Sequence, residues 1–141
     1  MNYVAFNPMK HLDYVREVTQ VDIGITTRGI VAENDAGKPQ GVVLFDAWTK
    51  TSVNAHISIQ NPMVLRGLHI EAFKYIFETC DRLMVLGIVA SDNEPARRLN
   101  RHLGFTQIAR IPNAVSVGVD QLVLQLLRQD CQYINQFKEV A

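Results

Sequence analysis

His56 is the residue in this chain whose type and position best suit proton transfer. It lies in the segment Val53 to Ile59, where apolar residues alternate with polar ones. Period-two alternation puts the two sets on opposite faces of a strand, so we expect His56 on a polar face that lines a cleft. An imidazole has an ordinary pKa of about 6.5, which suits a general base at neutral pH. The alternative is a histidine satisfied by its neighbours.

Other histidines and carboxylates offer weaker candidates for a base. His69 falls on the apolar side of its expected helix and is interpreted as structural. His11 and His102 are less favoured, because no pattern places them on the wall of a cleft. Asp46 and Glu33 are second choices that would act through water.

A polar stripe is expected on a short helix from Glu94 to Leu103. At about 100° per residue, Asn93, Arg97 and Asn100 fall within roughly 60° of one another. Such a stripe could hydrogen-bond a ligand that carries amide groups, and Arg97 could also contact phosphates. A solvated helix edge is an equally good interpretation.

A third feature is the start of the longest expected helix, which begins at Asn61 or Met63 and ends near Cys80. Asn61 could cap this helix, and Pro62 suits its first position. The N–H groups at a helix start attract anions such as a pyrophosphate. An ordinary helix start with no ligand is the alternative.

The elements that must position these residues alternate between strands and helices. The expected helices and strands are, in order, a helix at Lys10–Thr19, strands at Ile23–Glu33, Gly41–Trp48 and Val53–Ile59, the long helix, a strand at Leu83–Ala90, the helix Glu94–Leu103, strands at Phe105–Ile111 and Asp120–Leu127, and a terminal helix at Gln129–Phe137. The wholly apolar Leu83–Ala90 indicates a strand covered on both faces. Gly104 suits the left-handed residue that ends a helix.

Composition narrows the class of protein. The chain has 141 residues, one domain by length (residues 1–141), and equal numbers of basic and acidic residues, 14 each. Zero net charge argues against a nucleic-acid binder. The two cysteines match no metal spacing, so no metal is expected. The sequence shows no signal peptide and no membrane span, which predicts a cytoplasmic protein without a membrane partner.

The run from Asn93 to Phe105 resembles a motif of the GNAT N-acetyltransferase superfamily. The motif has an Asn, an Ala three residues later, an aliphatic residue six later, and a closing Leu-Gly-Phe, and every spacing is met. The resemblance covers roughly Gly41 to Leu127. It implies an α/β (α+β) fold in which helices cover both faces of a central mixed, mostly antiparallel sheet with one splayed parallel strand pair. It also implies acetyl-CoA as cosubstrate.

The resemblance also implies where the cosubstrate lies. Val53–Ile59 and Leu83–Ala90 would be the splayed strands, and backbone groups near Ile57 and Ile59 would pair with the pantetheine arm. The other implied cofactor-binding residues are Val64, Leu65, Arg66, Gly67 and Leu68 at the helix start, and Asn93, Arg97 and Asn100 on the following helix.

The sequence departs from the family pattern at two places. Of the family's Gln/Arg-x-x-Gly-x-Gly/Ala signature only the last glycine, Gly67, survives, with Pro62 and Leu65 in the other places. Asn100 occupies the position of a tyrosine that often protonates the departing thiolate. An amide could still hydrogen-bond the sulfur, so Asn100 remains a candidate catalytic residue beside His56.

These observations predict an acyltransferase that moves an acetyl group from acetyl-CoA to a primary amine. The amine would attack the thioester directly, with His56 or an ordered water taking its proton and the backbone near Ile57 polarising the carbonyl. The acceptor could be a small molecule or a protein. An edge strand near the C-terminus would allow a homodimer. The rival hypothesis is a GNAT fold that no longer catalyses and serves as a binding or structural protein.

Overall fold

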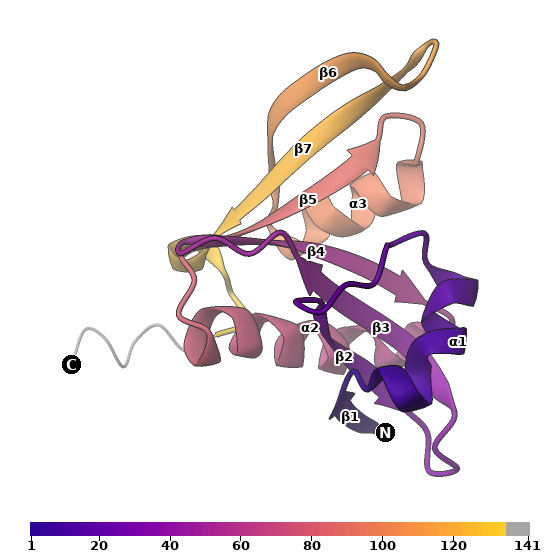
Figure 1. Ribbon diagram of the computed structural model, residues 1–141. Coiled ribbons are helices and arrows are strands. Elements are labelled where there is room, and N and C mark those ends of the chain that lie inside the picture. The colour runs from indigo at the N-terminus through magenta and orange to yellow at the C-terminus, as the bar shows by residue number, and fades with distance from the viewer. Residues whose placement is uncertain (135–141) are drawn as a thin grey trace, which may run out of the picture.

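A seven-stranded mixed sheet forms the centre of the protein (Figure 1). The structure is a computed structural model and describes residues 1–134. The strands, in sheet order, are β1 (Asn2–Ala5), β2 (Arg28–Glu33), β3 (Pro39–Asp46), β4 (Ser52–Ile59), β5 (Met84–Ala90), β7 (Val119–Leu127) and β6 (Thr106–Ser116). The prediction of a mixed, mostly antiparallel sheet is confirmed, because β4 and β5 form its parallel pair and the other neighbours are antiparallel.

The parallel pair separates soon after it forms. Pairing joins Ser52 to Met84, Val53 to Val85 and Asn54 to Leu86 and goes no further. Figure 1 shows the arrows of β4 and β5 diverging toward their ends. We call the place where they part the fork. The edge of β4 that faces β5 has no strand pairing from Ala55 to Ile59, as the predicted splay requires.

Helices cover both faces of the sheet, as the sequence predicts. Helix α1 (Pro8–Val18) packs against one face through a core that includes Val15, Val42 and Leu44. Helices α2 (Leu65–Phe73) and α3 (Glu94–Leu103) lie on the other face. The core under them is built mainly from β3, β4, β5 and α2.

The long helix begins and ends where the sequence predicts, but it is not uniform. A 3₁₀ turn, Pro62–Val64, precedes α2, and a π-helical stretch, Lys74–Thr79, extends it to Cys80. The Asn61 side chain accepts a hydrogen bond from the Met63 N–H, so the predicted cap is confirmed. Gly104 ends α3 with φ of 100°, a left-handed conformation that glycine adopts without strain.

Three expectations need correction. Residues 23–27 are not part of a strand, and β2 begins at Arg28, because the Thr27 hydroxyl and N–H bond to Gly24 and close a turn there. The strand β1 was not predicted. Of the expected terminal helix, residues 128–130 form a 3₁₀ turn and residues 131–134 are irregular. The remainder, residues 135–137, lies outside the described residues.

A buried polar cluster ties α1 to β2. Glu33 accepts hydrogen bonds from Lys10 and from His11 Nε2, both at 2.8 Å, and His11 Nδ1 accepts from the Asn7 N–H. The bonds from Lys10 and then from His11 hold the pKa of Glu33 below its usual value of 4.5. Neither Glu33 nor His11 is among the residues that line the cleft near the fork.

We expect Glu33→Ala to lower the free energy of unfolding by roughly 1–3 kcal/mol, because the buried His11 N–H would lose its acceptor. The pKa of Glu33 is lowered in the folded state, so its stabilisation is complete above its ordinary pKa and is lost as the pH falls through the folded-state pKa. Urea unfolding at neutral and acidic pH measures both effects. Glu17→Ala, at an exposed position of α1, is the matched control and should change neither. Equal stability of the two variants at neutral pH would contradict the assigned role.

Candidate functional site

An open cleft lies on the α1 side of the sheet at the fork. Its volume is about 590 Å³. Its walls come from the segment after α1, the ends of β3 and β4, Ile88 of β5 and the start of α3. The residues that line it include Asp22, Asp46, His56, Ile57, Ser58 and Asn93.

His56 forms the centre of this cleft together with a carboxylate. Its Nε2 lies 2.8 Å from Oδ1 of Asp46, and both side chains are partly exposed, at 29% and 27%. The two strands place them side by side, because Asp46 pairs with Asn54, two residues before His56 on the same face. A carboxylate bonded to Nε2 leaves Nδ1 as the nitrogen that can accept a proton.

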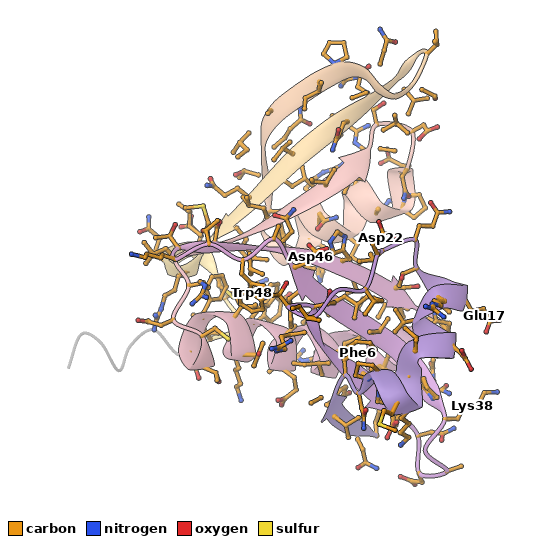
Figure 2. The ribbon with its side chains drawn as sticks, in the orientation of Figure 1. Phe6, Glu17, Asp22, Lys38, Asp46 and Trp48 are labelled. Atoms are coloured by element: carbon orange, nitrogen blue, oxygen red, sulfur yellow. The ribbon has the colours of Figure 1, made fainter. Side chains whose placement is uncertain are left out.

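A second carboxylate stands across the cleft. Asp22 belongs to the segment that follows α1 and lines the cleft together with Asp46 (Figure 2). The segment begins at Val18, the last residue of α1, and this end of the helix is anchored to β4. The Ser58 hydroxyl donates to the Val18 carbonyl at 2.9 Å. Two carboxylates around one histidine give the cleft a negative potential, which attracts cations.

On the other side of the fork, under α2 and α3, lies a small apolar cavity. Its volume is about 40 Å³, and Ile57 borders both this cavity and the cleft. Asn100 reaches its wall from α3, while its Nδ2 donates to the Ala96 carbonyl at 2.8 Å. Ile57 therefore lies where a ligand passing through the fork would contact both faces of the sheet.

The structure brings some predicted site residues together and separates others. Asn93 caps α3 through a bond from the Ala96 N–H and lines the cleft, whereas Asn100 lines the cavity. Arg97 lies on the far side of α3, where it donates to the Ser91 carbonyl at 3.1 Å and lines a separate hollow against β7. The predicted stripe is therefore not a single ligand-facing surface.

The helix start also differs from the expectation. The Val64 N–H donates to the Asn61 carbonyl and the Leu65 N–H to the Pro62 carbonyl, so these donors are already used within the chain. The side chains of Val64 and Leu68 are fully buried in the core. Arg66 is exposed at the start of α2.

Gly67 packs directly against a side chain of β1, a contact that the sequence alone does not show. A Cβ at this position would lie 2.0 Å from the hydroxyl of Tyr3 on β1. The tip of the Tyr3 side chain therefore occupies the space that a Cβ at Gly67 would take, and a larger residue here would have to displace it. Trp48 donates to the Thr26 carbonyl and packs against Tyr75, and it is not among the residues that line the cleft.

Within residues 1–134, no cluster of three or more His, Cys, Asp or Glu side chains could hold a metal ion. No helix in the same part of the chain is both long and apolar enough to cross a membrane.

Comparison with known proteins identifies the fold. No family model and no curated protein sequence matches the chain. Among solved structures it is similar to the spermidine/spermine N-acetyltransferase SpeG from Vibrio cholerae in complex with manganese ions. That match has a TM-score of 0.77 and 16% identity over 91% of this chain and 92% of the other.

A chimera of the Vibrio cholerae spermidine N-acetyltransferase and hSSAT matches with a TM-score of 0.78 and 16% identity, over 96% of this chain and 100% of the other. The mixed sheet of seven strands, its one parallel pair and its helices agree with the GNAT fold of these matches. The chain therefore has the GNAT fold of the N-acetyltransferases.

Proposed function

We propose that this protein transfers an acetyl group from acetyl-CoA to the primary amine of a small cationic acceptor. The observation that carries the proposal is the His56–Asp46 pair, at 2.8 Å, in an acidic cleft at the fork of a GNAT fold. The pair offers a base whose orientation is fixed by a carboxylate. The polyamine substrates named for the similar structures belong to the same acceptor class.

The residues of the fork fit a pantetheine thioester. The edge of β4 from Ala55 to Ile59 lacks a strand partner, so its backbone groups can pair with the amides of the pantetheine arm. A backbone N–H near Ile57 would polarise the thioester carbonyl. Arg66 at the start of α2 would contact the pyrophosphate, and Asn93 at the cleft wall would contact the arm.

The transfer would proceed by direct attack. A free amine at the cleft attacks the thioester carbon, and His56 Nδ1 accepts the proton that the nitrogen must lose. The new C–N bond forms, the C–S bond breaks, and the CoA thiolate leaves with a proton from solvent. A neighbouring amide such as Asn100 could hydrogen-bond the sulfur, although it cannot act as a phenol does.

A second candidate function is that of a binding protein with this fold that no longer catalyses. Two observations favour it. Gly67, the last glycine of the family signature, packs against Tyr3, and the Asn100 amide bonds back to its own helix. Neither observation accounts for the His56–Asp46 pair in an open cleft.

Acetyl-CoA should raise the melting temperature, because a ligand that binds only the folded state stabilises it by mass action. Differential scanning fluorimetry with acetyl-CoA up to about millimolar concentration measures the shift, and adenosine triphosphate is the control for nonspecific phosphate binding. CoA release with spermidine as acceptor then separates an enzyme from a binding protein. A shift without CoA release would favour the binding protein, and no shift would contradict both functions.

A further inference from the structure

The apolar cavity at the fork has room that an acetyl group does not fill. Its volume of about 40 Å³ corresponds to roughly three water-sized groups. Most of its wall is aliphatic or aromatic and includes Phe45, Ala55, Ala72, Ile76, Val85 and Gly87. An acetyl group has one methyl to place beyond its carbonyl, so space for about two further carbons remains.

The cavity lies at the inner end of the path that a thioester would take. A pantetheine arm enters from the open side of the fork, where β4 and β5 are far apart. Ile57 lies on that side, whereas Val85 pairs with Val53 where the strands are still joined. The part of a bound acyl-CoA that reaches past Ile57 toward Val85 is therefore the end of the molecule that enters first. In an acyl-CoA that end is the acyl group.

An unsatisfied histidine in the cavity wall independently indicates a ligand. His69 is 4% exposed, and neither Nδ1 nor Nε2 has a hydrogen-bond partner among the described residues. Burial, followed by the charges of His102 and Arg66, lowers the pKa of His69 to about 4, so the ring is neutral at physiological pH. A buried polar group without a partner is unfavourable unless a ligand or water completes it.

We propose that this cavity is an acyl pocket and that the protein accepts acyl groups of about three or four carbons, as well as acetyl, from CoA thioesters. The inference rests on the proposed function, because that function identifies the donor as a CoA thioester. The hydrocarbon chain lies against Phe45, Ala55, Ile76 and Val85. His69 donates its N–H to a carbonyl of the donor or accepts from an amide of the pantetheine arm.

Gly87 allows the size of the pocket to be changed by one methyl group. A Cβ at Gly87 would meet its nearest neighbours, Asn100 Oδ1 and Phe105 Cε2, at 3.8 and 3.9 Å, which are ordinary contacts. Gly87→Ala should therefore fold normally with a smaller cavity. Gly24→Ala is the matched control, because its Cβ would meet only Thr27 Oγ1, at 4.0 Å, away from the cavity.

Isothermal titration calorimetry with CoA, acetyl-CoA and butyryl-CoA tests the pocket without requiring turnover. Each buried methylene strengthens binding roughly fourfold, so the wild type, with two more methylenes to bury, should bind butyryl-CoA about 15-fold more tightly than acetyl-CoA. Gly87→Ala should reduce that preference to near parity and leave the affinity for CoA itself unchanged. Gly24→Ala should keep the wild-type preference.

Ala72→Val fills the same cavity from α2 and provides a second variant should Gly87→Ala fold poorly. Equal wild-type affinity for acetyl-CoA and butyryl-CoA, or a butyryl preference that survives both cavity-filling variants, would overturn the acyl pocket. A butyryl preference without turnover of any thioester would support the pocket and contradict the proposed function. Turnover of acetyl-CoA with rejection of butyryl-CoA would support the proposed function and contradict the acyl pocket.

Discussion

His56→Ala should lower turnover by at least about tenfold while leaving the affinity for acetyl-CoA nearly unchanged. A positioned base typically contributes ~10²–10⁴ in rate. The nitrogen of the attacking free amine must lose a proton as the amide forms, so a group in the cleft must take that proton. His56 lines the cleft, and its bond to Asp46 through Nε2 leaves Nδ1 as the nitrogen that can accept a proton.

The measurement is CoA release with a cationic amine across about pH 6 to 9, a range that spans the ordinary titration of an imidazole. His102→Ala, at an exposed position of α3, is the matched control and should keep wild-type turnover. Equal turnover of His56→Ala and the wild type would contradict the base assignment and leave water or another residue to accept the proton.

Asp46→Asn is expected to have the next largest effect, a loss in kcat of at least about tenfold, because it removes most of the benefit of a positioned base. The Asp46 carboxylate can only accept from His56 Nε2, which keeps the proton on that nitrogen and leaves Nδ1 basic. An asparagine amide can instead donate to Nε2. That bond would favour the tautomer with its proton on Nδ1, which cannot accept another from the amine.

Asp22→Asn separates this effect from a general loss of negative charge. Asp22 lines the same cleft, whereas Asp46 is the carboxylate that is bonded to His56. We therefore expect Asp22→Asn to raise the KM for a cationic amine and to leave kcat close to the wild-type value. Steady-state kinetics of both variants with one amine give the comparison. Matching changes in kcat and KM for the two variants would show that Asp46 contributes charge alone.

The layers of the fold could be predicted because strong local patterns mark them. Alternation in Val53–Ile59, the apolar run after Leu83 and the Asn93–Gly104 helix signals all correspond to the elements found. The first strand could not be predicted in the same way. With only four residues, Asn2–Ala5 is too short for a periodic pattern, and its place depends on pairing with β2.

The missed strand explains why Gly67 was interpreted only as part of a phosphate-binding signature. Tyr3 reaches α2 from β1, so its contact with Gly67 cannot be foreseen until β1 is placed. The sequence alone shows a glycine near a helix start, which either reason could explain. Only the three-dimensional contact distinguishes them.

The His56–Asp46 pair could be predicted in part. Both residues were candidate bases, but their partnership depends on the register of β3 and β4, which pairs Asp46 with Asn54. Register follows from how the hairpin is closed and packed, and neither is visible in the alternation of one strand. His69 was predicted to be buried, yet its lack of a hydrogen-bond partner emerges only with the cavity around it.

Mass spectrometry of the amine after incubation with acetyl-CoA tests the central claim most directly. Purified protein, acetyl-CoA and spermidine should yield N-acetylspermidine together with an equal amount of free CoA, and His56→Ala should yield far less of both. Omitting the amine should suppress CoA release, because transfer rather than hydrolysis is the reaction. Bound acetyl-CoA with no acetylated amine, across a panel of cationic and neutral amines, would contradict the proposed transferase.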